Sequence, residues 1–147
     1  MLKKLKLSLV VFMTVFSISA WSMPDNSDPL YLLVSFSMPT ASLEMYCQNA
    51  NQYNTTLVLR GLVNNSLIET QKKLASNNLS KCEWQIEPRL FSNLNITHVP
   101  VGIMFENPLT VGSFESNKGY ARIDGNISLD EIRARLVQNL ENTVRLD

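Results

Sequence analysis

The sequence predicts an α/β fold: a three-layer sandwich in which a small mixed β-sheet carries helices on both faces. Short apolar runs that suit buried strands alternate with segments of helical periodicity, in the order β-α-β-α-β-β-α. The first apolar run ends at Ser37-Met38-Pro39-Thr40 and passes directly into a helical pattern. Pro100 opens the apolar run 101–105. Because proline cannot donate to a sheet ladder, we predict a special backbone geometry there, a cis Val99–Pro100 peptide bond.

The first half of the domain should form a βαβ unit followed by a second helix. A strand is expected at residues 30–35, a helix from residue 39 or 40 to 53, and a second strand at residues 56–59. The helix between these strands makes them parallel neighbours through a right-handed crossover. Ser66 and Glu69 have the spacing of a capping box, so a second helix is expected to reach about residue 76.

The second half should complete the sheet and end in a long helix. Residues 84–86 suit a short extended segment and residues 88–94 a helical turn. Strands are expected at residues 101–105, 110–114 and 120–123, the last two paired around a turn. Ser128 and Glu131 again have capping-box spacing and open a helix whose core residues recur at helical intervals: Leu129, Ile132, Leu136 and Leu140.

A strand, a short turn into a helix and a later Val-Pro that opens another strand form the skeleton of a thioredoxin-like domain. Where a thioredoxin carries Cys-x-x-Cys, this chain has Ser37-Met38-Pro39-Thr40, so that position offers no dithiol for exchange. We therefore predict one thioredoxin-like domain over residues 23–147 that lacks a CxxC motif.

Residues 1–22 have the features of a secretory signal peptide. Lys3, Lys4 and Lys6 form a basic start, and the apolar segment 7–20 is shorter than the roughly 20 residues that a membrane span needs. Small residues favour cleavage before Met23, with cleavage after Ser19 or Ala20 as alternatives, and an uncleaved anchor is the other interpretation. We expect a protein exported to the periplasm, in contact with the membrane only through its export signal.

Charge and composition argue against several functional classes. Removal of the three lysines of the signal peptide leaves ten basic and thirteen acidic residues, so we expect no nucleic-acid partner. His98 is the single histidine and no acidic or cysteine ligands are suitably spaced around it, so we expect no metal and no other cofactor. Ser35 and Ser37 lack a Gly-x-Ser-x-Gly elbow, and Ser37 is expected to cap the first helix instead. No catalytic residue is predicted.

The two cysteines, Cys47 and Cys82, allow two interpretations. An even number of cysteines in an oxidising compartment favours a disulfide. Alternatively, Cys47 lies on the apolar face of the first predicted helix, where a free thiol behaves as a small hydrophobic side chain.

Three loops should converge at one edge of the sheet, where parallel strands end and the antiparallel third strand begins. They are Ser37-Met38-Pro39, Arg60-Gly61-Leu62 and His98-Val99-Pro100. Because α/β sheets place ligands beyond the carboxyl ends of their strands, we predict that these nine residues bind a partner. Met38 and Arg60 are expected to reach solvent. For Arg60 we favour pairing with Glu69 on the next helix, and the alternative is that its guanidinium faces a partner carboxylate.

A set of motifs across the predicted domain resembles the TrbC family, the periplasmic assembly factors of type-F conjugative pili. The motifs are residues 31–39 (YLLVSFSMP), 57–62 (LVLRGL), 69–70, 86–91 (IEPRLF), 96–100 (ITHVP) and 125–129 (GNISL). The resemblance implies a non-enzymatic scaffold in the envelope part of a type IV secretion apparatus, acting by protein–protein interaction on a TraW-like partner and on other pilus assembly proteins, without a small-molecule substrate.

Two other functions remain open on the sequence. One is a periplasmic thiol-disulfide oxidoreductase or isomerase that uses Cys47 and Cys82. The other is a free-standing periplasmic binding or immunity protein. Reactivity requires an exposed thiolate, whereas Cys47 is expected about two turns inside a helix on its buried face.

Overall fold

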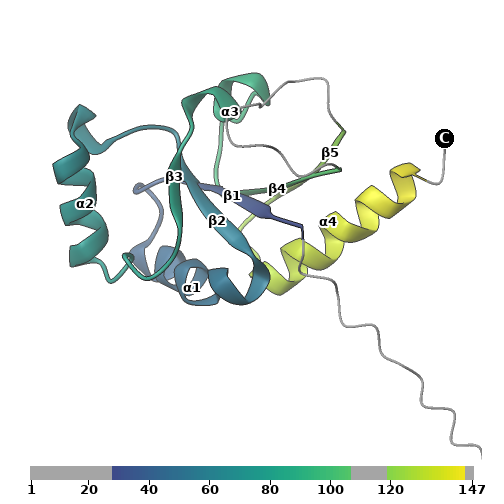
Figure 1. Ribbon diagram of the computed structural model, residues 1–147, viewed down its shortest axis with the longest axis horizontal. Coiled ribbons are helices and arrows are strands. Elements are labelled where there is room, and N and C mark those ends of the chain that lie inside the picture. The colour runs from purple at the N-terminus through teal and green to yellow at the C-terminus, as the bar shows by residue number, and fades with distance from the viewer. Residues whose placement is uncertain (1–27, 107–118, 145–147) are drawn as a thin grey trace, which may run out of the picture.

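The computed structural model describes residues 28–106 and 119–144 and shows an α/β fold around one mixed sheet (Figure 1). Within these residues the sheet has five strands in the order β3-β2-β1-β4-β5. The strands β1, β2 and β3 are parallel, and β4 and β5 are antiparallel to their neighbours. The predicted strand at residues 110–114 lies outside the described residues. The five strands are β1 (Leu30–Val34), β2 (Thr55–Leu59), β3 (Trp84–Ile86), β4 (Val101–Phe105) and β5 (Tyr120–Asp124).

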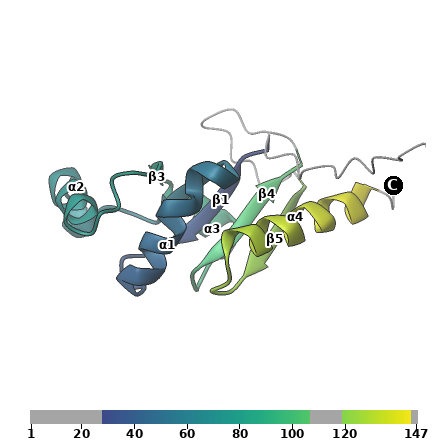
Figure 2. The same ribbon diagram turned by 90° about the horizontal axis from the view of Figure 1, so that it is seen from below.

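Helices cover both faces of the sheet, as predicted. The helices α1 (Thr40–Ala50) and α4 (Leu129–Val144) pack on one face, and α3 (Pro88–Asn93) packs on the other. Figure 2 shows α1 and α4 along the same side of the strands, with α3 behind them. The remaining helix, α2 (Leu67–Ser76), lies beyond the β3 edge of the sheet in both views. Two 3₁₀ turns, η1 (Asn51–Tyr53) and η2 (Val63–Asn65), follow α1 and precede α2.

The central strand β1 is apolar throughout because both of its faces are covered. Leu32 and Val34 belong to the core cluster beneath α1 and α4, whereas Leu33 belongs to the cluster beneath α3. Gly102 of β4 permits a close approach of α4, since any side chain at that position would overlap Ile132. The predicted stripe on α4 is confirmed: Leu129, Ile132 and Leu136 are buried.

Local capping agrees with the sequence at one helix and differs at another. The side chain of Ser66 caps α2 and accepts a hydrogen bond from the Glu69 N–H at 3.3 Å, as the capping box predicts. The prediction that Ser37 caps α1 is wrong, because Pro39 occupies the N-cap and makes no side-chain cap bond. The helix α1 also ends at Ala50, and the turn η1 replaces its expected last residues.

Arg133 of α4 is a buried cation that ties the start of the domain to its core. Its side chain donates hydrogen bonds to the carbonyl oxygens of Tyr53 at 2.9 Å and Asp28 at 3.0 Å. These bonds join α4 to the end of η1 and to the segment that enters β1.

Within residues 28–106 and 119–144, no helix is both long enough and apolar enough to span a membrane.

Candidate functional site

A cavity of about 320 Å³ opens at the edge of the sheet where β1 and β2 end and β4 begins. The three loops selected from the sequence meet here, as their places in the sheet predict. Six of their nine residues line the cavity: Ser37, Arg60, Gly61, Leu62, His98 and Val99. The role of these residues in partner binding stays a prediction.

The other three predicted site residues lie around the cavity but do not line it. Pro39 is exposed at the start of α1, and Pro100 is buried next to the Val99–Pro100 peptide bond, which is cis as predicted. Met38 is half-buried and packs against the core cluster beneath α1 and α4. The side chain of Met38 was predicted to reach solvent, and only a part of it does so, because the rest is packed on the core.

The inner wall of the cavity is apolar and well packed. Val34 and Leu59, at the ends of two central strands, are at most 3 % exposed. Phe91 of α3 and Ile96, which follows that helix, are each 4 % exposed. The rim carries the hydroxyl groups of Ser35, Ser37 and Thr97, so an occupant would meet an apolar floor and a polar mouth.

His98 is held in place by a chain of polar side chains. Its Nε2 lies 2.9 Å from Asp124 Oδ2, and its Nδ1 lies 3.2 Å from Thr97 Oγ1. Asp124 also accepts hydrogen bonds from Arg122 Nε at 2.6 Å and Nη2 at 2.8 Å, while Arg122 Nη1 donates to the Leu94 carbonyl at 3.1 Å. These bonds fix the loop before β4 to the end of β5.

The carboxylate of Asp124 is stabilised in its charged form. Hydrogen bonding to the Arg122 guanidinium is the main cause that lowers the pKa of Asp124, with a smaller contribution from His98. The same hydrogen bond raises the pKa of Arg122. Sequence reasoning missed both residues because they lie more than 20 positions after His98. The pairing of Val101 with Asp124 in the β4–β5 register brings them together.

The arrangement does not assemble a nucleophile beside a base. Ser35 Oγ and Ser37 Oγ lie 2.9 Å apart, and the Ser37 N–H donates to Ser35 Oγ at 3.2 Å. In the described part of the chain neither hydroxyl is hydrogen-bonded to His98, whose two ring nitrogens face Thr97 and Asp124. Within the same residues no group of three potential metal ligands is suitably placed.

Arg60 presents its positive charge at the rim. Its side chain is exposed and forms no ion pair within residues 28–106 and 119–144. Glu69 Oε2 accepts a hydrogen bond from Asn64 Nδ2 at 2.7 Å instead. The predicted pairing of Arg60 with Glu69 is therefore wrong.

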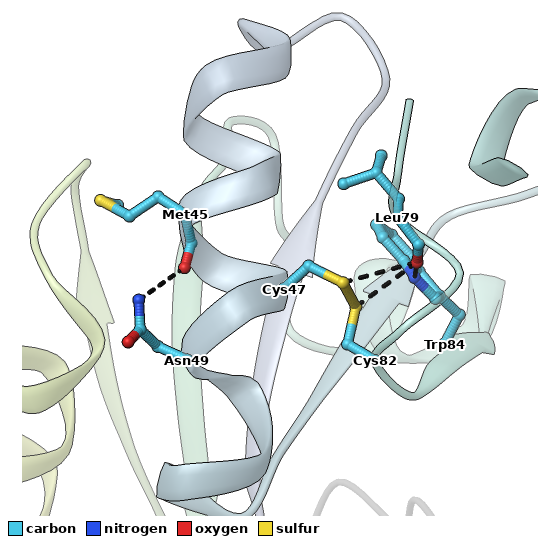
Figure 3. Close-up of a disulfide and its surroundings, with 6 residues drawn as sticks. All are labelled: Met45, Cys47, Asn49, Leu79, Cys82 and Trp84. Carbon is cyan, nitrogen blue, oxygen red and sulfur yellow. Dashed lines mark hydrogen bonds between the residues drawn. A yellow bond between two sulfur atoms is a disulfide. The ribbon is translucent and has the colours of Figure 1, made fainter. Parts of the chain in front are cut away.

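Cys47 and Cys82 form a disulfide that joins α1 to the segment before β3 (Figure 3). The two sulfur atoms lie 3.5 and 3.6 Å from the Leu79 carbonyl oxygen. Because disulfide sulfurs carry no hydrogen, these are close S···O contacts, and the actual donor to that oxygen is Trp84 Nε1 at 2.6 Å. Phe36, which lines the cavity, stacks on Trp84 with 6.0 Å between ring centroids. The Leu79 carbonyl therefore lies between the disulfide and the aromatic pair whose Phe36 lines the cavity.

A comparison with protein-family models gives a match over residues 32–135, well over half of the chain, to the type-F conjugative transfer system pilin assembly proteins. No curated protein and no solved structure matches the chain. The matched region contains all three loops that meet at the cavity. The chain therefore belongs to the TrbC family of type-F conjugative transfer system pilin assembly proteins.

Proposed function

We propose that this protein is an exported, non-enzymatic scaffold that assists assembly of the type-F conjugative pilus by binding other assembly proteins, among them a TraW-like partner. The observation that carries the proposal is the cavity at the sheet edge, where three loops converge around an apolar floor and an exposed arginine. Ser35 bonds to Ser37, and His98 bonds to Thr97 and Asp124, so among the described residues neither serine hydroxyl of the cavity is paired with a base, which favours recognition over catalysis.

A thioredoxin-like fold is part of the proposal. Four strands in the order β2-β1-β4-β5, with α1 and α4 on one face and α3 on the other, agree with the predicted arrangement. The cis Val99–Pro100 bond precedes β4, and Ser37-Met38-Pro39-Thr40 stands at the start of α1, where a thioredoxin carries its dithiol. In this interpretation α2 and β3 are an addition at one edge of the sheet.

A periplasmic location is supported by the basic and apolar segments of residues 1–22 and by the disulfide. Disulfides persist in oxidising compartments such as the bacterial periplasm. Fractionation of cells that produce the full chain with a C-terminal tag would test this location: recovery with cytoplasmic marker proteins would contradict it.

The binding role is tested by capture of a TraW-like protein on the purified chain. We expect Arg60→Glu to reduce capture because it reverses the charge at the rim of the cavity, with little change in melting temperature because Arg60 is exposed. Lys81→Glu is the matched control, since Lys81 is also exposed but does not line the cavity. Equal capture by the wild type and Arg60→Glu would contradict a binding role for this edge.

The thiol-disulfide enzyme is tested separately. Cys47 is 4 % exposed inside α1, on the face that packs against the sheet, whereas reactive cysteines are accessible and often lie at helix N-termini. We therefore expect no turnover in an insulin-reduction or disulfide-isomerisation assay. Turnover that disappears in Cys47→Ser would support the enzyme and overturn the scaffold proposal.

A further inference from the structure

The size of the cavity limits what it can hold. Its volume of about 320 Å³ is at the lower end of the range for ligand pockets, and its floor consists of buried apolar side chains. A site of this kind suits one or two apolar side chains of a protein segment, which would displace water from Phe91 and Ile96.

The residues that line the cavity carry permanent charge of one sign only. Among the described residues that line it, there is no aspartate or glutamate, and Arg60 is the permanent cation. The nearby carboxylate of Asp124 is already paired with Arg122, which holds its pKa below the usual value. A partner carboxylate placed beside Arg60 would therefore find a complementary charge.

The first turn of α2 carries exposed apolar side chains and lies a few residues along the chain from one wall of the cavity. Leu67 and Ile68 have exposed fractions of 56 % and 65 %, the highest among large apolar side chains in the described part of the chain. Ser66, the N-cap of α2, separates them from η2, and Val63 of η2 lines the cavity. The Val63 N–H donates to Thr70 Oγ1 at 2.9 Å, which fixes this wall of the cavity against α2.

Glu69 in the same turn adds a negative charge beside the exposed pair. A partner carboxylate would be repelled there and attracted to Arg60. These two charges fix the orientation of a bound segment. Its carboxylate would lie at the cavity, and an apolar side chain next to that carboxylate would lie on α2.

We infer that the cavity and the first turn of α2 form one docking surface for a protein segment that combines apolar side chains with a carboxylate. The carboxylate faces Arg60, one apolar side chain enters the cavity, and another covers Leu67 and Ile68. This inference rests on the proposed function and specifies which partner segment the site recognises.

The test is selection of random heptapeptides on the purified full chain, processed as the producing cell processes it. Wild-type protein should enrich peptides that carry Asp or Glu within two positions of Leu, Ile, Val or Phe. For one enriched peptide, synthesised with a fluorescent label, Arg60→Glu and the pair Leu67→Gln/Ile68→Gln should each weaken binding at least about tenfold. Lys81→Glu and Met45→Gln are the controls: Lys81 is an exposed cation and Met45 is an apolar side chain on α1 that is 38 % exposed.

A charge swap adds a readout that loss of folding cannot produce. Selection on Arg60→Glu should replace acidic by basic residues in the enriched peptides while the apolar residues remain. The inference is overturned if no peptide is enriched, if the enriched peptides lack acidic residues, or if the four variants bind the labelled peptide alike. If a TraW-like protein is still captured in those cases, the proposed function stands and only the chemistry of the segment is wrong.

Discussion

The two walls of the cavity are built differently. On the β4–β5 side, His98, Asp124 and Arg122 form a continuous hydrogen-bonded chain above the buried side chains of Phe91 and Ile96. On the α2 side, Arg60 is exposed, and α2 buries Thr70 alone among its ten residues. One wall is fixed by the core, whereas the other is attached to it at a few points and displays charge and apolar surface to solvent.

This difference indicates a division of roles. The β4–β5 wall sets the position of the cavity, because its side chains are bonded to one another and to the body of the sheet. The α2 wall buries little apolar surface in the folded domain. Leu67 and Ile68 therefore remain accessible to a partner. Substitutions in the two walls should therefore separate stability from binding.

The largest contrast is expected between Phe91→Ala and Leu67→Ala. Phe91 is 4 % exposed and part of the core cluster beneath α3, so its truncation should lower the free energy of unfolding by about 4 kcal/mol. Leu67 is 56 % exposed, and its truncation should change that energy by less than about 0.5 kcal/mol. Urea unfolding of both variants measures the contrast, and similar losses would show that α2 is a core element after all.

Removal of the disulfide should loosen the α2 wall more than the β4–β5 wall. Cys47 and Cys82 are 35 positions apart, and a cross-link over such a loop contributes about 4 kcal/mol to stability. In the double variant Cys47→Ala/Cys82→Ala, hydrogen exchange should accelerate most in α2 and β3. If hydrogen exchange accelerates equally in all five strands, the two walls are not stabilised separately, and the proposed division of roles is contradicted.

Thr70 is the link between α2 and the cavity, and its hydroxyl can be removed without a large change in volume. The hydroxyl accepts from the Val63 N–H at 2.9 Å and donates to the Ser66 carbonyl at 2.8 Å. Thr70→Val should cost about 1 to 2 kcal/mol because it leaves the Val63 N–H without this acceptor, whereas the Ser66 carbonyl still accepts from the Thr70 N–H at 3.1 Å. Thr70→Ser keeps the hydroxyl and should cost less; the opposite order in thermal unfolding would point to packing as the role of this side chain.

The smallest effect is expected at Asp124 and depends on pH. Its pKa is lowered in the folded state, so it stabilises the protein above the unfolded pKa of about 3.8, and this contribution is lost as the pH falls through the folded value. Because the side chain is 36 % exposed, Asp124→Asn should cost less than about 1 kcal/mol at pH 7. Unfolding measured over a series of decreasing pH values should show this cost shrink as Asp124 becomes protonated; a cost that does not depend on pH would assign it to altered packing.

Much of the β4–β5 wall could be predicted from the sequence, and much of the α2 wall could not. The strands around Leu33, the cis Val99–Pro100 bond and the convergence of the loops follow from apolar runs, a proline and parallel connectivity. Asp124 was missed because its contact with His98 depends on the β4–β5 register, which single residues do not reveal.

The exposure of Leu67 and Ile68 was also beyond sequence reasoning. The capping box of Ser66 and Glu69, which encloses these two residues, predicts where a helix begins, and only the position of α2 beyond the sheet edge shows that the two side chains remain in solvent. Met38 illustrates the reverse: its turn was correctly placed at the edge, but its side chain packs on the core.

Plasmid transfer in a strain that lacks the gene tests the central claim most directly. We expect transfer and pilus production to be lost in the deletion strain and restored by the wild-type chain and by Lys81→Glu. The variants Arg60→Glu and Leu67→Gln/Ile68→Gln should restore transfer and pilus production poorly, because they alter the α2 wall without disturbing the core. Immunoblots should confirm that all variants are present at equal levels. Wild-type transfer in the deletion strain would contradict a role in pilus assembly, and full restoration by both wall variants would contradict a role for this surface.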